Sequence, residues 1–181
     1  MKSDFKELVS RARRGDAEAF GELYSAIYKD LYYYALCNLN NSDDAADAVS
    51  DAVLDAFSGI KNLRNEEAFQ GWMVRILTAK IKRKQAEYIS QREYISSTTS
   101  DYDDADEGEM NDIPDRESKY EGIELLEHIE GLSHNEKMCF TLNAIYGYTS
   151  DEVSKITEIN NATVRTYIAR AKQKLRKALS D

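Results

Sequence analysis

The chain has 181 residues, of which 42% are hydrophobic and 31% are charged, and its formal net charge is −9. This length allows one ordinary domain or two small ones, and eight glycines with a single proline favour an all-helical protein. The sequence has no apolar run long enough to cross a membrane and no signal peptide, which predicts a cytoplasmic protein without membrane insertion.

Four amphipathic helices are predicted in the first half of the chain, over about residues 5–14, 17–39, 44–60 and 65–88. In each of them apolar side chains recur at helical spacing. Asp16, after the break at Gly15, is a good N-cap for the second helix. This half therefore predicts a small helical domain over residues 1–88.

The third of these helices carries four aspartates, Asp44, Asp47, Asp51 and Asp55, with no basic residue among them. Their spacing of three or four residues stacks the carboxylates on one face. A solvated acidic helix usually includes lysine or arginine for pairing one turn away. The stripe indicates either an ordinary solvated face or a docking surface for a basic protein, and the spacing alone leaves both open.

The fourth helix has an apolar stripe that includes Trp72 and five basic side chains between residues 75 and 84, with no acidic one. A basic helix beside aromatic side chains suits single-stranded or distorted nucleic acid. The same pattern also fits a solubilising face. We expect Trp72 itself to be an anchor between helices.

The excess of acidic residues lies in one middle segment. Residues 88–121 carry 3 basic and 11 acidic side chains, contain Pro114 and lack sustained periodicity. Such a composition is typical of a solvated linker that buries little apolar surface. We therefore expect an acidic, largely disordered linker over 89–120, whose beginning can extend the preceding helix for a turn or two, followed by a second small helical domain over 121–181.

Four shorter helices are predicted in this second domain, near residues 121–131, 133–146, 150–157 and 161–179. Thr149 or Ser150 is expected to cap the third of them. The last has an apolar stripe and six basic side chains from 162 to 179, with no acidic one. A short capped helix, a turn and a longer basic helix are typical of a DNA-binding helix-turn-helix. The alternative is an amphipathic helix with a solvated basic face.

The sequence offers no constellation for catalysis. Cys37 and Cys139 lie in apolar helical runs and are expected to be buried free thiols. His128 and His134 belong to no cluster with metal-ligand spacing, and neither a phosphate-binding loop nor a nucleophile elbow is present. The sequence therefore predicts no metal, no cofactor and no enzymatic activity.

Four segments occur in an order that is typical of one family. They are RARRGDAEAFGELYSAIYKDLYYYA, DAADAVSDAVLDAF, FQGWMVRIL and the stretch from LSHNEKM to QKLRKAL. In this order they resemble the bacterial sigma-70 family, and within it the small extracytoplasmic-function type that keeps only regions 2 and 4. The resemblance covers nearly the whole chain outside the linker.

The resemblance implies that the acidic helix binds a coiled coil of core RNA polymerase, through Asp47, Val49, Asp51, Leu54 and Asp55. It implies that the basic helix recognises and helps melt the −10 promoter element, through Arg75, Lys80, Lys82, Arg83 and Lys84. It implies that the last helix reads the −35 element of promoter DNA, through Asn161, Thr163, Arg165, Thr166, Arg170 and Lys172. An anti-sigma factor is a further partner that the family implies.

Four positions depart from the family's pattern. The family usually has Asn where Ala79 stands, Asp and then Arg where Arg83 and Ala86 stand, and proline where Ser133 stands. The first three bear on promoter melting and on the −10 sequence that is recognised.

Two other functions fit parts of the sequence. One is a helix-turn-helix transcriptional regulator whose N-terminal helices sense a ligand or dimerise. The other is a helical adaptor that binds only protein, for which the basic last helix would be a coincidence. Neither requires both the acidic helix and the basic helix of Trp72, and their presence together favours the sigma factor.

Overall fold

The computed structural model describes residues 2–98 and 129–179, with the side chains of 5–94 and 129–179. Within these residues the chain forms helices and turns without a strand, which confirms the all-α prediction. The helices are α1 (Lys2–Arg13), α2 (Ala17–Leu39), α3 (Ser42–Gly59), α4 (Phe69–Thr98), α6 (His134–Tyr146), α7 (Ser150–Thr157) and α8 (Asn161–Ala178). Two short 3-10 turns, η1 (Ile60–Asn62) and η2 (Glu66–Ala68), connect α3 to α4.

Helix α4 extends into the expected linker, somewhat further than the one or two turns that the sequence allowed. It continues to Thr98 and does not end near Tyr88, so the first residues of the expected linker are helical. The rest of that linker, and most of the helix expected near 121–131, lie outside the described residues.

Polar side chains cap the helices where the hydrophobic pattern breaks. Asp16 and Asn41 accept hydrogen bonds from backbone N–H groups three residues later, at 3.0 and 2.9 Å. Ser133 and Thr149 each form a capping box with a glutamate three residues later. Ser133 thus begins α6 with a side-chain cap at the position where the family usually has proline.

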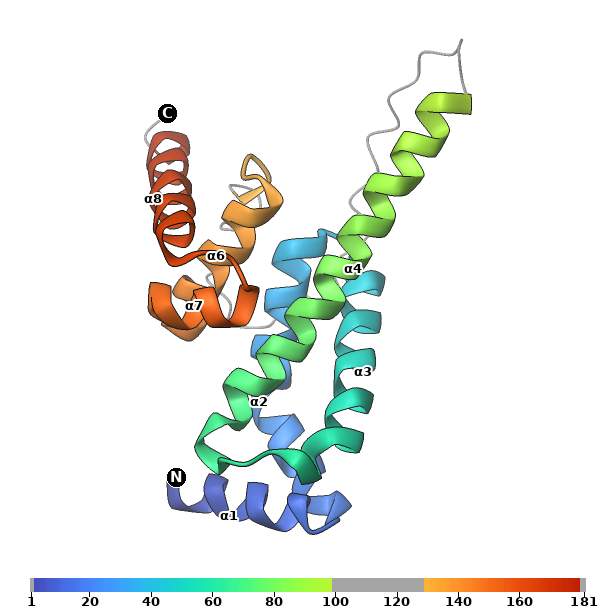
Figure 1. Cartoon of the computed structure of the whole chain (residues 1–181), viewed down its shortest axis with the longest axis vertical. Coiled ribbons are helices and arrows are strands. Elements are labelled where there is room, and N and C mark those ends of the chain that lie inside the picture. Colours follow the sequence, from blue (N-terminus) through green and yellow to red (C-terminus); the bar gives the residue numbers. More distant parts are fainter. Residues whose placement is uncertain (1, 99–128, 180–181) are drawn as a thin grey trace.

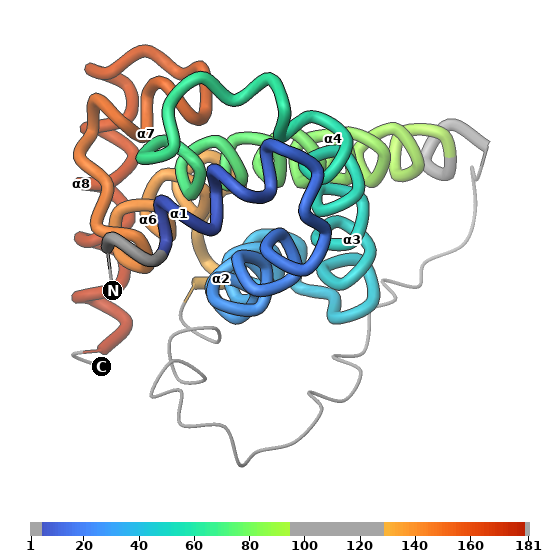
Figure 2. Tube along the Cα trace, turned by 90° about the horizontal axis from the view of Figure 1, so that it is seen from below, coloured from blue at the N-terminus to red at the C-terminus, as the bar shows by residue number. Residues whose placement is uncertain are grey.

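The helices form two groups that pack on each other. Figure 1 shows α2, α3 and α4 side by side, with α1 across one end of them and α6–α8 grouped to one side. Seen from below in Figure 2, α6–α8 and α3 lie on opposite sides of α2. Helix α2 contacts α6, and α4 contacts α7. The outward side of α3 is therefore turned away from the second group.

One apolar core runs through both groups of helices. It includes Tyr34, Phe69 and Leu77 of the first group together with Leu142 and Val153 of the second, all fully or almost fully buried. A smaller cluster joins Cys37, on α2, to side chains of α6 and α8. Burial of apolar area is the main favourable contribution to folding, so this continuous core holds the two groups together.

Trp72 lies between helices, as expected, at the edge of the core. Its ring is half-buried, 6.2 Å from the ring of Phe69 between centroids, and it covers the backbone of Gly59 at the end of α3. Both cysteines are buried free thiols, which confirms that prediction. Within residues 2–98 and 129–179, none of the helices combines the length and the apolar character that a membrane span needs.

Candidate protein and nucleic-acid interfaces

The aspartates of α3 share one face of the helix but differ in how they are paired with α4. Asp44 and Asp55 face α4, where Lys84 Nζ lies 2.5 Å from Asp44 Oδ1 and Lys80 Nζ lies 2.6 Å from Asp55 Oδ2. Asp47, Asp51 and Asp55 are exposed, and Asp47 also lies within ion-pair distance of Lys84. The stripe is thus partly neutralised by cations from another helix, which the spacing of acids within α3 did not indicate.

Apolar side chains on the outward side of α3 accompany the exposed acids. Leu54 is 66% exposed and Phe57 is 50% exposed. Exposed large apolar side chains next to charges are typical of protein docking surfaces. Val49, in contrast, is 1% exposed and belongs to the core, so it cannot contact a partner in this arrangement. Its expected place in the docking surface is corrected to a packing role.

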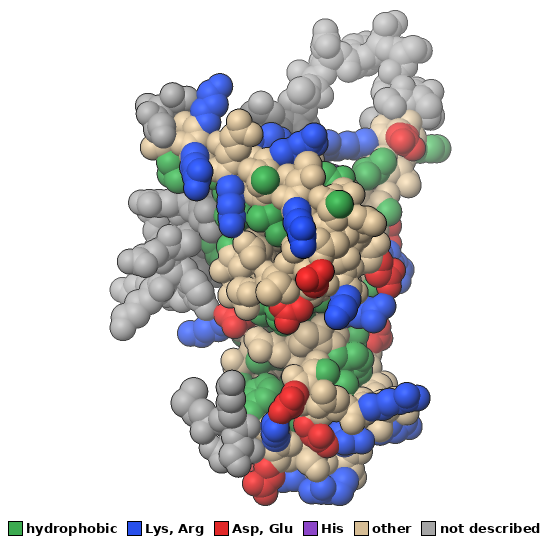
Figure 3. All heavy atoms as spheres, turned by 60° about the vertical axis from the view of Figure 1, so that its left-hand side comes forward, with side chains coloured by type: hydrophobic (Ala, Val, Ile, Leu, Met, Phe, Trp, Pro, Cys, Tyr) green, Lys and Arg blue, Asp and Glu red, His purple; other side chains and the backbone are tan. Residues whose placement is uncertain are grey.

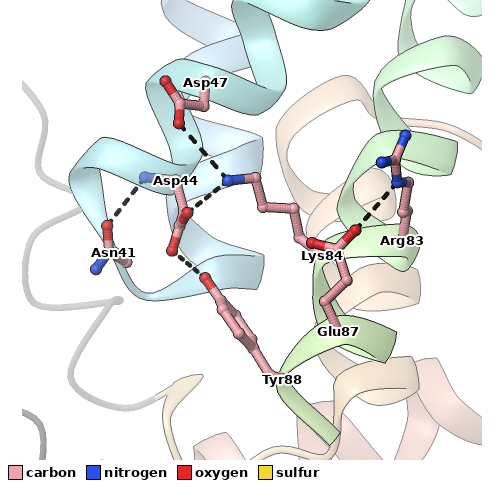
Figure 4. Close-up of polar contacts among 7 residues, drawn as sticks. All are labelled: Asn41, Asp44, Asp47, Arg83, Lys84, Glu87 and Tyr88. Carbon is pink, nitrogen blue, oxygen red and sulfur yellow. Dashed lines mark hydrogen bonds and ion pairs between the residues drawn. The ribbon is translucent and has the colours of Figure 1, made fainter. Parts of the chain in front are cut away.

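Asp44 is the centre of a polar network between α3 and α4, drawn in Figure 4. Its Oδ1 accepts from Lys84, and its Oδ2 accepts from the hydroxyl of Tyr88. The same Lys84 Nζ lies 3.7 Å from Asp47 Oδ2. Burial raises the pKa of the Asp44 carboxyl, but the hydrogen bonds from Lys84 and Tyr88 outweigh burial and hold that pKa below its ordinary value.

This network predicts part of the pH dependence of stability. A carboxylate whose pKa is lowered on folding stabilises the fold above its unfolded-state pKa, and that contribution is lost as the pH falls through the folded-state pKa. We expect Asp44→Asn to lower the free energy of unfolding by about 1 kcal/mol at pH 7, and to reduce the further loss below about pH 4. Chemical denaturation at pH 7 and pH 3 measures both effects.

Asp43→Asn is the matched control, because Asp43 is an exposed acid in the same first turn of α3. Equal losses in the two variants would contradict the network and would point to the helix dipole alone.

The five basic side chains of α4 do not share one face. Lys80 and Lys84 pair with α3, whereas Arg75 Nη2 lies 2.8 Å from Glu158 Oε1, just after α7. Lys82 donates to the backbone carbonyl of Thr157, the last residue of α7. Arg83, 74% exposed, pairs within its own helix with Glu87 at 3.1 Å. Four of the five expected nucleic-acid contacts are thus engaged by other helices in this arrangement.

Helices α7 and α8 form a short capped helix, a turn and a longer helix. Thr149 caps α7, and Glu158 ends it in the left-handed conformation with φ 60°. Asn160 caps α8 by accepting from the backbone N–H of Ala162 at 2.9 Å. Val153 and Val164 are fully buried and hold the two helices against the core. The local structure therefore agrees with the expected helix-turn-helix.

The outward side of α8 is basic and polar. Figure 3, which shows this side of the molecule, has Lys and Arg side chains spread over the part formed by α8, with few acidic ones among them. Five of the six residues expected at the −35 element are exposed: Thr163, Arg165, Thr166, Arg170 and Lys172. The sixth, Asn161, is half-buried and donates to Asp151 Oδ1 of α7.

The contact between the two groups of helices is aromatic and polar as well as aliphatic. Tyr34 and Tyr146 pack edge-to-face with centroids 6.0 Å apart, and Tyr146 stacks on Tyr148 at 5.3 Å. Asn38 Nδ2 donates to Thr141 Oγ1 at 3.2 Å. Asn38 Oδ1 and the hydroxyl of Tyr146 are buried and have no hydrogen-bond partner among the residues that the structure describes. Unpaired buried polar atoms weaken such a contact by about 1–3 kcal/mol each.

Sequence reasoning missed Tyr88 and the pairing of α4 with α3 and α7. The one signal in the sequence was that a basic run, between residues 75 and 84, and an acidic run, between residues 44 and 55, have similar lengths. Helix wheels could not show which cations meet which acids, because that depends on how α3, α4 and α7 cross.

Comparison with known proteins finds two family models that match the chain. The family model described as "Sigma-70 region 2" matches residues 23–87, and "Sigma-70, region 4" matches residues 123–175. The ECF RNA polymerase sigma factor BldN of Streptomyces coelicolor is 27% identical over 176 residues, covering 97% of this chain and 66% of that protein. The ECF RNA polymerase sigma-E factor of Haemophilus influenzae is 27% identical over 176 residues, covering 92% of this chain and 90% of that protein.

Among solved structures, the sigma factor RpoE of Bartonella quintana, in complex with the anti-sigma factor NepR, has a similar fold. Its TM-score is 0.69 at 16% identity, and the alignment covers 89% of this chain and 96% of that one.

Proposed function

The chain belongs to the sigma-70 family of RNA polymerase sigma factors, in its extracytoplasmic-function group, and on this premise we propose which promoter element or protein each helix binds. Residues 1–88 bind core polymerase through α3 and the −10 element through α4. Residues 121–181 bind the −35 element through α7 and α8, and residues 89–120 connect the two. The protein acts in the cytoplasm and has no catalysis of its own.

The observation that carries the proposal is the α7–α8 pair. A capped short helix holds α8 so that its apolar stripe is buried while Thr163, Arg165 and Thr166 are exposed near its N-terminal end. Early residues of a recognition helix reach base edges in the major groove, and basic groups further along contact phosphates. Arg170 and Lys172 suit the phosphate contacts.

The outward side of α3 supports the assignment to core polymerase. Asp47, Asp51 and Leu54 are exposed on a helix that lies away from α6–α8 (Figures 1 and 2). Exposed carboxylates beside an exposed leucine suit a basic, amphipathic helix as partner. Asp55 contributes to this docking surface through its other carboxylate oxygen, since Oδ2 is paired with Lys80.

The assignment of α4 to the −10 element requires a rearrangement. Of the five basic residues, Arg75 and Arg83 are exposed in the described arrangement, and Arg75 and Lys82 contact the α7 segment. We propose that α7 moves off α4 before Arg75 and Lys82 meet DNA. Lys80 and Lys84 mainly hold α4 against α3, through their ion pairs with Asp55 and Asp44.

The deciding experiment is a reconstitution of the protein with core polymerase on candidate promoters. Promoter-specific initiation is expected only when both proteins are present. Tight binding to duplex DNA with no binding to core polymerase would favour the helix-turn-helix regulator instead.

Arg165→Ala tests the −35 assignment. We expect promoter affinity of the assembled complex to fall by about 1–3 kcal/mol, because a base-edge contact would be lost. Filter binding or anisotropy on promoter duplex measures it. Lys177→Ala, an exposed cation in the last turn of α8, serves as control and should change affinity less. Unchanged affinity in the Arg165 variant would show that Arg165 is not one of the residues that contact the −35 bases.

An anti-sigma factor is a further proposed partner. The sigma factor of Bartonella quintana with a similar fold was solved bound to one. A protein that holds the two groups of helices of this chain together would keep Arg75 and Lys82 from DNA, which is a simple mechanism of inhibition.

A further inference from the structure

Two side chains near the start of α8 are held by hydrogen bonds to the first turn of α7. Arg165 Nε donates to Ser150 Oγ at 3.3 Å, and Asn161 Nδ2 donates to Asp151 Oδ1. Ser150 and Asp151 are the first two residues of α7, whereas Asn161 begins α8 and Arg165 follows one turn later. Two consecutive residues of one helix thus each hold a side chain of the next helix.

These two hydrogen bonds are not what holds α7 and α8 together. The fully buried Val153 and Val164 pack the two helices against the core. Ser150 is half-buried and Asp151 is exposed, so both lie outside that core. A hydrogen bond between surface side chains replaces hydrogen bonds to water and adds little to stability. The main consequence of the two bonds is the orientation of the side chains that they hold.

The bond to Ser150 leaves the reading end of Arg165 available. A guanidinium group is planar and has five N–H donors, of which one is on Nε and four are on the two Nη atoms. Ser150 accepts from Nε, which fixes the plane of the group while both Nη atoms keep their donors. Parallel donors of this kind fit O6 and N7 of guanine. A long side chain that is held before DNA arrives loses less conformational entropy on binding.

The bond to Asp151 decides which way the amide of Asn161 points. A carboxylate accepts hydrogen bonds and donates none, so the amide nitrogen, and not the amide oxygen, lies against Asp151. Oδ1 and the second N–H of Asn161 remain for another partner. One acceptor and one donor are the groups that a bidentate contact with adenine requires. The reversed amide would set its oxygen against the carboxylate.

We infer that Ser150 and Asp151 are positioning residues that set the base preference at the −35 element, through Arg165 and Asn161 respectively. This inference rests on the proposed binding of α8 to the −35 element. It adds to that site two residues of α7 that act through the recognition helix and not by touching a base.

The first test is the base preference of the full-length chain assembled with core polymerase. Promoter duplexes randomised over the −35 element are bound, and sequencing of the bound fraction gives the relative affinity for each base at each position. Arg165→Ala identifies the position that Arg165 reads. At that position Ser150→Ala is expected to lower the preference about fivefold, with a smaller change in affinity averaged over all sequences. Ser150→Thr keeps the hydroxyl and should restore most of the preference.

Asp151→Asn is expected to change affinity and preference in opposite directions. The exposed carboxylate of Asp151 repels DNA phosphates, so the neutral amide should raise the affinity averaged over all sequences, most at low salt. An asparagine at this position can also donate, which lets the amide of Asn161 reverse. The preference at the position read by Asn161 should therefore fall. A role in stability alone would not give higher affinity together with lower preference.

Ser154→Ala is the matched control, because it makes the same chemical change in the same helix. Ser154 Oγ donates to the backbone carbonyl of Ile159 at 2.6 Å, in the turn before α8. Its loss should lower the unfolding midpoint and leave the base preference unchanged. If Ser154→Ala alters the preference as much as Ser150→Ala does, general loosening of the two helices explains the effect and the inference is overturned.

The remaining outcomes separate this inference from the proposed function. If Arg165→Ala alters the preference whereas Ser150→Ala and Asp151→Asn do not, the inference is overturned and the binding of α8 to the −35 element stands. Equal weakening on every sequence by Ser150→Ala would indicate that Ser150 itself contacts a phosphate, which also overturns it. If Arg165→Ala leaves the preference at every −35 position unchanged, the assignment of Arg165 to the −35 bases fails, and the inference fails with it.

Discussion

A cross-link that holds α7 against α4 is expected to abolish promoter-dependent initiation while leaving the binding of core polymerase unchanged. A Cβ added at Gly71 of α4 would lie 3.9 Å from the hydroxyl of Tyr148, just before α7. Cysteines at these two positions, Gly71→Cys and Tyr148→Cys, can therefore be joined by a short bismaleimide. Initiation should fall about 100-fold or more, because the linked protein cannot populate the open arrangement.

The reason is the distance between the promoter elements. Elements named for positions −35 and −10 are separated by about 25 base pairs, or roughly 80 Å of duplex at about 3.4 Å per base pair. In the described arrangement Arg75 of α4 touches Glu158, in the turn before the recognition helix α8. With α4 on the −10 element and α8 on the −35 element, as proposed, one promoter meets both helices only after they separate. Helix α3 lies away from α7, so core polymerase that docks on α3, as proposed, can bind before or after that separation (Figure 2).

The native cysteines do not interfere with this experiment. Burial raises the pKa of Cys37 to about 12 and that of Cys139 to about 11, so neither thiol has much reactive thiolate near neutral pH. The double variant treated with a monofunctional maleimide is the control for the substitutions themselves. A reducible cross-linker should allow activity to return on reduction. Full initiation by the cross-linked protein would contradict the requirement for opening.

Reversing one charge on α3 is expected to give the second large effect. Asp51→Lys should weaken the binding of core polymerase about tenfold or more, because an attraction across the interface becomes a repulsion. The fold should be retained, because Asp51 is exposed and the new lysine stands one turn from both Asp47 and Asp55. Equilibrium titration against core polymerase at low and at physiological salt measures the change.

Glu22→Lys is the matched control for this charge reversal. Glu22 is an exposed acid of α2 that lies near Arg11 of α1. The same change in net charge there should leave polymerase affinity nearly unaltered. Equal weakening by both variants would mean that net charge, and not the surface of α3, governs the association.

The cations of α4 show a feature that the sequence could not predict, namely which residue each basic side chain contacts. Five basic residues without an acid between them indicated a nucleic-acid surface. In the fold they point in three directions, with Lys84 on Asp44, Lys82 on Thr157 and Arg83 toward solvent. The partners are 40 and 75 residues away in the chain. Periodicity assigns a side chain to a side of its helix, but the neighbour on that side depends on the packing of helices.

Local features were readable from the sequence because their causes are local. Helical periodicity, the caps at Asp16 and Thr149, the buried thiols and the helix-turn-helix pattern depend on residues within a few turns of one another. Together with the order of four segments, they were sufficient to predict an all-α sigma factor. The family matches over residues 23–87 and 123–175 agree with that prediction.

The tertiary structure decided the features that depend on helices packing together. It placed Val49 in the core, continued α4 to Thr98 and joined the two groups of helices through Tyr34 and Tyr146. Whether a stripe is buried, paired or exposed depends on which other element covers it, and that choice is made by the whole core.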